Sequence, residues 1–170
     1  MPSTKLYISP GNETVWSHAG ADRLLDARGL LYSGGCACGA LLDLGPAPRA
    51  DRYEVELFVD GFSGGDPNMG GIVAVYFIQS EDGVNWDGPP TTAPTVSAQG
   101  TVTFAQARHG KFAVAVHVVS TTRTDTMRGR RVLRLTSRYV APVIVNFADE
   151  LLNSSGNHRV TLRAIPYEQQ

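Results

Sequence analysis

The chain has 170 residues, of which 42% are hydrophobic and 18% are charged, and its formal net charge is −1. This composition excludes a disordered chain, which combines low hydrophobicity with high net charge. The longest apolar run is too short for a transmembrane helix, and the N-terminal residues show no hydrophobic region of a signal peptide. The length predicts one domain large enough to bury a core.

Strand signals are weak in the first 50 residues. Residues 6–8, 15–16 and 40–44 are each long enough for a short strand. Residues 21–28 fit either one helix or a strand pair joined at Arg28 and Gly29. We also expect residues 1–20 to form an extended N-terminal arm.

Later in the chain, apolar and polar residues alternate with a period of two, as expected of half-buried strands. The pattern predicts seven strands, at residues 53–59, 72–78, 101–106, 111–120, 131–139, 143–147 and 158–165. Segment 72–78 is apolar on both faces and is predicted to be a central strand. Residues 148–152 allow at most one helical turn. Short strands separated by Gly-rich turns are typical of a sandwich or barrel. We therefore predict an all-β chain: a single, jelly-roll-like β-sandwich of about eight strands, with little helix.

The same alternation assigns side chains to the interior. We expect Phe112 to share the inward face of its strand with Val114, and Tyr139 to point inward at the end of segment 131–139. The predicted core consists of Val55, Leu57, Val75, Phe77, Val114, Val116, Leu133, Leu135, Val160 and Leu162.

Charge is unevenly distributed along the chain. Residues 1–107 hold five basic and twelve acidic side chains, a sum of −7, and residues 108–139 hold eight basic and one acidic, a sum of +7. Three interpretations remain open: basic strands paired with acidic ones inside one subunit, a protein–protein contact surface, or a nucleic-acid surface. The last is disfavoured because a nucleic-acid binder usually has a basic excess over the whole domain.

The basic segment predicts a specific stripe. Arg130, Arg134 and Arg138 fall on one face of the expected strand 131–139 and its flank, and so repel each other unless carboxylates lie opposite. Glu54 and Glu56 share one strand face and can supply those carboxylates from the same subunit; acids of a neighbouring molecule are the alternative. These five residues are the candidate interface.

No pattern supports catalysis or a cofactor. Cys36 and Cys38 are expected to face the same way from a strand, with Ala37 opposite, as two buried or loop thiols. A structural zinc site needs four ligands, and no second cysteine pair exists. His117 alternates with alanines and is expected to be a satisfied or surface histidine. We therefore predict no enzyme, no cofactor and no metal.

The most distinctive motif is residues 80–88, which read Ser-Glu-Asp-Gly-Val-Asn-Trp-Asp-Gly. It is similar to the hairpin S-x-D-G-x-x-W and to a shortened sialidase Asp box. We expect a structural turn in which Gly83 takes a positive φ, Asp82 caps nearby amides and Trp86 folds back over the hairpin. A calcium loop requires a different spacing of acids; a carbohydrate platform on Trp86 is the remaining alternative.

Three segments, residues 76–86, 138–146 and 160–167, resemble small β-sandwich virion proteins of tailed bacteriophages, above all capsid decoration (cement) or other auxiliary head proteins. The resemblance implies a jelly-roll-like fold, no cofactor, self-assembly as an oligomer (a trimer is expected), and binding to the major capsid protein on the head surface, after assembly in the host cytoplasm. It implies no nucleic-acid or membrane partner and supplies no catalytic residue.

Two hypotheses for function follow. The first is a structural virion protein of the head, or of the tail. The second is a carbohydrate-binding β-sandwich or receptor-binding module that uses Trp16, Trp86 and surface tyrosines as sugar platforms. Buried tryptophans together with a self-complementary apolar patch favour the first hypothesis, and exposed aromatic side chains on one face favour the second.

Overall fold

The structure is a computed structural model, and it describes residues 13–19, 23–46, 50, 52–87 and 103–165. Among the residues that the structure describes, about half are in strands and only four are in a helix. Twelve strands and one short helix follow in chain order: β1 (Glu13–Ser17), β2 (Arg23–Leu24), β3 (Gly35–Cys38), β4 (Leu42–Asp43), β5 (Arg52–Asp60), β6 (Phe62–Ser63), β7 (Ile72–Ser80), α1 (Phe104–Ala107), β8 (Lys111–His117), β9 (Thr126–Arg134), β10 (Tyr139–Asn146), β11 (Leu151–Leu152) and β12 (Arg159–Ala164).

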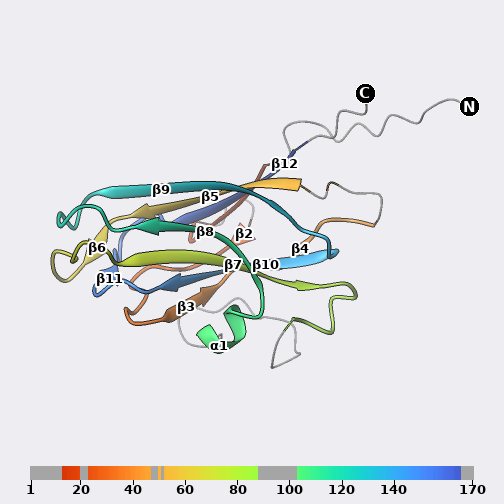
Figure 1. Ribbon diagram of the computed structural model, residues 1–170, viewed down its shortest axis with the longest axis horizontal. Coiled ribbons are helices and arrows are strands. Elements are labelled where there is room, and N and C mark those ends of the chain that lie inside the picture. Colours follow the sequence, from red (N-terminus) through yellow and green to blue (C-terminus); the bar gives the residue numbers. More distant parts are fainter. Residues whose placement is uncertain (1–12, 20–22, 47–49, 51, 88–102, 166–170) are drawn as a thin grey trace, which may run out of the picture.

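Two sheets pack face to face (Figure 1). The first sheet has the order β2-β1-β12-β5-β9, and the second has the order β3-β10-β7-β8, with β4 also paired to β10. Strands β6 and β11 form a small separate pair at one end of the sandwich. The all-β sandwich expected from the alternation pattern is therefore confirmed.

The order of the strands is that of a jelly roll. Numbered in chain order, the eight strands of four or more residues form the sequences 1-8-3-6 in the first sheet and 2-7-4-5 in the second. The chain crosses repeatedly from one sheet to the other, so each sheet interleaves strands from the beginning and the end of the chain. This arrangement of two Greek keys in a double sheet is characteristic of jelly rolls.

The interior between the sheets contains the side chains that the period-two pattern selects. All ten predicted core residues are buried: Val55, Leu57, Val75, Phe77, Val114, Val116, Leu133, Leu135, Val160 and Leu162. Trp16 joins them, and its ring packs edge-on against Phe77 with centroids 6.0 Å apart. The strand registers inferred from sequence are thus confirmed at these positions, since a one-residue slip would have exposed them.

Phe112 does not share the face of Val114, contrary to the expectation. Val75 pairs with Val114, but the next residue, Tyr76, pairs with Phe112, so Ala113 is an extra residue that forms a β-bulge in β8. The bulge turns Phe112 to the outer side, where its ring packs against Tyr76 with centroids 5.6 Å apart. An extra residue shifts the alternation by one, and a period-two count cannot anticipate it.

The predicted strand 131–139 was also wrong. It is divided between β9, which ends at Arg134, and β10, which begins at Tyr139, because the chain passes there from the first sheet to the second. Leu135 is fully buried at the crossing. The alternation therefore continues through the segment without forming one strand, and Tyr139 packs outside the second sheet rather than in the main core.

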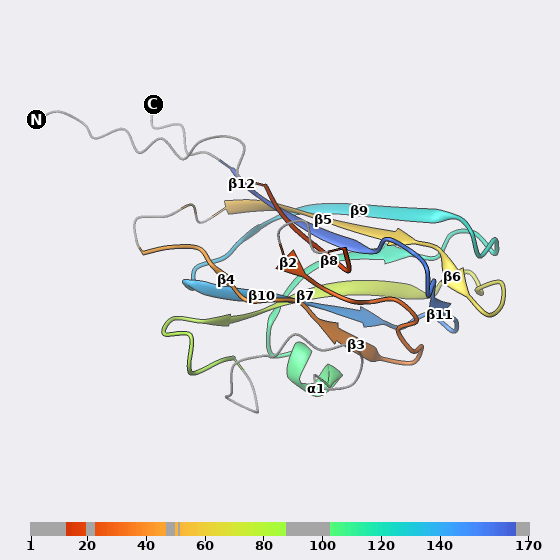
Figure 2. The ribbon, with the colours of Figure 1, turned by 180° about the vertical axis from the view of Figure 1, so that it is seen from behind.

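Three smaller expectations need correction. The predicted strand 101–106 is replaced in its described part by the helix α1, which lies against the outer side of the second sheet (Figure 2). Of residues 21–28, the described part contains the strand β2 and a turn at Arg28 and Gly29, so it forms neither the helix nor the full strand pair that the sequence left open. Residues 13–17 of the expected N-terminal arm form β1 within the first sheet, where β12 pairs with it, and residues 1–12 lie outside the described residues.

Candidate interaction surfaces

The two outer surfaces of the sandwich differ in chemistry. We call the outward side of the first sheet the charged face; it is formed by Glu13, Glu54, Glu56, Phe58, Arg128, Arg130, Arg159 and Arg163. We call the outward side of the second sheet the apolar face; it is formed by Cys36, Cys38, Tyr76, Ile78, Trp86, Ala107, Ala141, Val143 and Val145.

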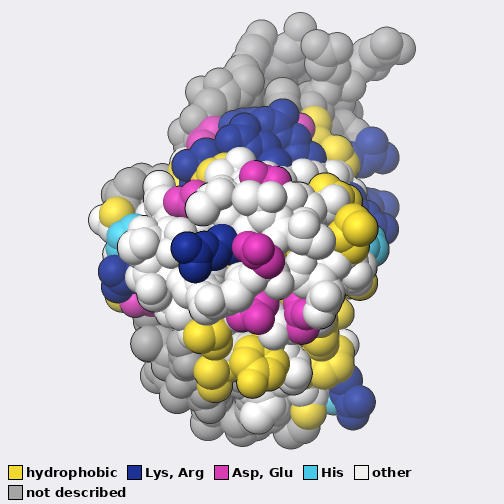
Figure 3. Space-filling model, turned by 90° about the vertical axis from the view of Figure 1, so that its left-hand side faces the viewer, with side chains coloured by type: hydrophobic (Ala, Val, Ile, Leu, Met, Phe, Trp, Pro, Cys, Tyr) yellow, Lys and Arg dark blue, Asp and Glu magenta, His cyan; other side chains and the backbone are white. Residues whose placement is uncertain are grey.

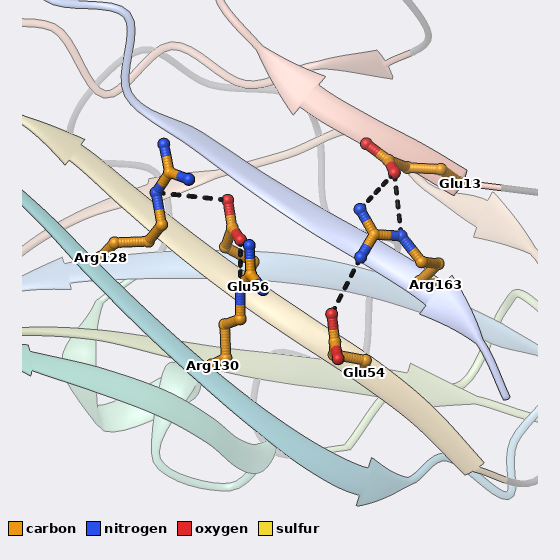
Figure 4. Close-up of polar contacts among 6 residues, drawn as sticks. All are labelled: Glu13, Glu54, Glu56, Arg128, Arg130 and Arg163. Carbon is orange, nitrogen blue, oxygen red and sulfur yellow. Dashed lines mark hydrogen bonds and ion pairs between the residues drawn. The ribbon is translucent and has the colours of Figure 1, made fainter.

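Glu56 is the centre of the charged face. It lies opposite Arg130 in the register of β5 and β9, and its carboxylate accepts a hydrogen bond from Arg130 Nε. Arg128 Nε approaches the other carboxylate oxygen at 3.7 Å. Figure 4 shows the carboxylate between the two arginines. The predicted pairing of basic and acidic strands within one subunit is therefore confirmed for Glu56 and Arg130.

A second group of ion pairs lies farther along the same face. Arg163 of β12 donates from Nε to Glu13 at 2.9 Å and from Nη1 to Glu54 at 2.9 Å, so one guanidinium joins two carboxylates from neighbouring strands (Figure 4). The hydrogen bonding of Arg163 to the Glu13 carboxylate contributes most to raising the pKa of Arg163 above its ordinary value. Glu54 thus pairs with Arg163 and not with an arginine of residues 128–138.

The predicted arginine stripe is not continuous. Arg134 lies at the end of β9 opposite Arg52. Arg138 lies beyond β9 beside the second sheet, where its Nε and Nη2 donate to the carboxylate of Asp43 at 2.9 and 2.7 Å. Arg138 is separated from the other two arginines because the chain changes sheets between β9 and β10.

The sequence did not reveal the row that crosses the charged face beside Glu56. Arg159, Phe58 and Arg128 are opposite one another on β12, β5 and β9. The guanidinium carbons of Arg159 and Arg128 lie 4.4 and 5.1 Å from the centroid of the Phe58 ring, within the range of cation–π contacts. The alternation of residues 158–165 places Arg159 and Arg163 outward, but only the strand order shows which residues they meet.

The motif after β7 is the structural turn that the sequence predicts. Asp82 Oδ1 accepts hydrogen bonds from the backbone N–H groups of Asn85 at 2.7 Å and Val84 at 2.8 Å, and these bonds hold its pKa far below the ordinary value. Gly83 has a φ of 76°. The Trp86 indole N–H donates to the Gly83 carbonyl at 3.2 Å, and its ring is buried against the apolar face.

The two cysteines belong to the apolar face. Cys36 and Cys38 point to this side of β3 and are buried, whereas Ala37 points into the main core, as predicted. Burial raises the pKa of Cys36 to about 11 and that of Cys38 to about 12. Both groups are therefore held as neutral thiols at ordinary pH.

A row of aromatic rings lies beside the buried cluster of the apolar face. The rings of Tyr76, Phe104, Phe112 and Phe147 form a chain of edge-on contacts with centroids 4.8–6.1 Å apart. Phe112, Phe104 and Phe147 are each exposed by more than a third of their surface.

Neither surface contains a group that suggests a metal site or a membrane span. Within the described ranges, no cluster of three or more His, Cys, Asp or Glu side chains is arranged to hold a metal ion. No helix in this part of the chain has the length and apolar character needed to cross a membrane. His117 is exposed at the end of β8.

Comparison with known proteins gives no further assignment. No protein-family model matches the chain, and no curated protein sequence matches it either.

Proposed function

We propose that this chain is a non-enzymatic structural protein of a tailed-phage virion, namely a capsid decoration protein that binds the head lattice as an oligomer. The observation that carries the proposal is the jelly-roll order of the eight longer strands. Double-sheet jelly rolls are recurrent in viral capsid proteins and in lectins. The fold is compatible with both hypotheses that the sequence raised, and a second observation is needed to choose between them.

The tryptophans supply that second observation. Trp16 is fully buried and donates its indole N–H to the Ala40 carbonyl at 2.7 Å. Trp86 is 5% exposed and is bonded to its own turn. A sugar platform requires an exposed ring face, so neither indole serves as one. Their burial supports a structural protein over a carbohydrate-binding module.

The charged face supports an assembly role as well, because it presents ordered arginines. The exposed phenylalanine rings beside the apolar face fit the carbohydrate-binding alternative instead. A protein that binds at many equivalent sites needs surfaces with defined charge and shape, because complementarity fixes the partner and the register. A tail subunit has the same requirement, and the location on the head rests on the resemblance in residues 76–86, 138–146 and 160–167.

Co-sedimentation with phage heads tests the proposal. The full chain is mixed with heads of the phage that encodes it, prepared without the protein, and the bound fraction is measured against chain concentration. We expect saturable binding with a fixed number of chains per head, and displacement by unlabelled chain. Failure to sediment at high excess, together with binding to a glycan, would reject the proposal in favour of the carbohydrate-binding alternative.

A further inference from the structure

We propose that the charged face binds the acidic end of a second copy of this chain. Each subunit then contacts the next through two different surfaces, and the subunits close into a ring. The acidic end is the set of loops around β6 and β11 that carries Asp66, Asp125, Asp149 and Glu150. The inference rests on the proposed function only for its expectation of an oligomer; it adds the surfaces and their chemistry.

The charged face presents positive charge to solvent although it contains both signs. The Glu56 side chain is 9% exposed, whereas those of Arg128 and Arg130 are 49% and 54% exposed. The carboxylate therefore lies at the base of the cluster and the guanidiniums lie above it. The residues that define the charged face include four arginines and three glutamates, so the face has a net charge of +1.

The arginines are also oriented before any partner arrives. Arg128 and Arg130 approach the Glu56 carboxylate through Nε rather than through their terminal Nη atoms. The Phe58 ring lies under the guanidiniums of Arg128 and Arg159. Guanidinium Nη groups that are held in place are suited to bidentate bonds with carboxylates, since little side-chain entropy remains to be lost.

The acidic end supplies such carboxylates on ordered loops. Asp149 accepts a hydrogen bond from the backbone N–H of Asn68 at 3.1 Å, and Glu150 accepts one from Gly65 N–H at 3.2 Å. Asp66 accepts one from the N–H of Arg123 at 3.3 Å. These bonds use part of each carboxylate and fix its position. Arg123 offsets one of the four negative charges, which leaves about −3 on these loops.

The two surfaces adjoin each other on one subunit. In the view onto the β6 and β11 end, basic side chains gather along the top of the molecule and acidic ones lie across the middle of the end (Figure 3). A contact between two different patches is heterologous, and it produces either a ring or an open filament. Patches on opposite ends would give a filament, whereas patches on adjoining surfaces turn each subunit relative to the last and favour closure.

Charge reversal with rescue tests this contact in the absence of capsids. The mass of the full chain is measured by sedimentation equilibrium for the wild type, for Arg159→Glu on the face, for Asp149→Arg on the end, and for the double variant. We expect an oligomer for the wild type, at least a tenfold weaker association for each single variant, and recovery in the double variant. Lys111→Glu is the matched control: it makes the same charge change on β8, in the other sheet, and should leave the association unchanged.

Sodium chloride at 1 M should also dissociate the wild type, because the screening length falls to about 3 Å. Circular dichroism establishes that each variant is folded. A wild type that is monomeric throughout, or an oligomer that neither single variant weakens, would overturn the inference. So would a monomer that binds an acidic protein or a DNA oligonucleotide through Arg159. Head binding by a monomeric chain would leave the decoration function standing while removing the contact proposed here.

Discussion

The charged face and the apolar face have the same backbone geometry but use their outward side chains in opposite ways. On the charged face, acids on β5 pair across strands with arginines on β9 and β12. On the apolar face, the outward positions of β3, β7 and β10 are nearly all apolar, and α1 and Trp86 pack over them. Ion pairs therefore occupy the charged face, whereas further segments of the same chain pack over the apolar face. The difference teaches that a β-sandwich can have a second core outside its main one.

The largest effect should come from removing the side chain that covers the apolar face. Trp86→Ala should lower the free energy of unfolding by about 3–5 kcal/mol, because it truncates a buried aromatic ring. Val132→Ala, an exposed position on the charged side of β9, is the matched control and should change it by less than about 0.5 kcal/mol. Urea denaturation measures both. Equal costs would mean that the apolar face is not a core.

Thiol reactivity compares the two faces directly. An exposed thiol with a pKa near 8.5 is roughly one-tenth ionised at pH 7.5, whereas a pKa of about 11, that of Cys36, leaves roughly one thiolate in 3,000. Cys38, with a pKa of about 12, is ionised still less. In the variant Val132→Cys, we expect iodoacetamide to modify residue 132 more than 100-fold faster than either native cysteine, as followed by mass spectrometry.

Rapid labelling of Cys36 or Cys38 in the folded chain would contradict their burial. The same reagent added in denaturant is the control, and all three thiols should then react at similar rates. The raised pKa values also imply a loss of stability at alkaline pH, because the unfolded chain releases these protons from about pH 9 and the folded chain retains them.

The ion pairs of the charged face should differ among themselves by burial. Glu56→Gln should cost about 1–3 kcal/mol, because it removes the charged acceptor of a hydrogen bond made by a largely buried group. Glu54→Gln is the matched comparison on the same strand face; with a side chain 33% exposed, it should cost roughly 0.2–1 kcal/mol. Thermal unfolding measures both. A larger cost at Glu54 would reverse the assignment of Glu56 as the centre of the face.

The smallest effect should be the response of these two variants to salt. In 1 M sodium chloride, the cost of Glu54→Gln should nearly vanish, because exposed charge pairs are screened. Most of the cost of Glu56→Gln should remain, since its carboxylate is shielded from solvent. The measurement is the difference in unfolding free energy from the wild type at low and high salt. An equal loss at both positions would show that Glu56 is as solvated as Glu54.

Most of the fold followed from local patterns, and the failures have identifiable causes. Alternation identified Val55, Leu57, Val160 and Leu162 as interior residues, because these strands are regular and each has one polar face. It failed at Phe112, where a bulge shifts the count by one. Such a bulge depends on the pairing register of β8 with β7, and the sequence of β8 alone does not determine that register.

The contacts of the candidate interface residues were predicted only in part, for a related reason. The pairing of Glu56 with Arg130 was anticipated because both lie on strands with a clear polar face, and their role in an interface stays a prediction. The role of Arg163 depends on Glu13, which is 150 positions away along the chain. The role of Arg159 likewise depends on Phe58. These neighbours are set by the jelly-roll order. Arg138 was wrongly placed in the arginine stripe, because the alternation of polar and apolar residues does not change where the chain passes from one sheet to the other.

Strand β9 also has a consequence for solubility. It is the last strand of the first sheet among those that the structure describes, so one side of its backbone has no strand beside it. An uncovered strand edge is a template for pairing with the edge of another molecule, and it leads to aggregation. Arg128, Arg130, Arg131 and Arg134 all lie on this strand. Two such edges would have to bring these like charges together, so the arginines also protect a concentrated solution from edge-to-edge growth.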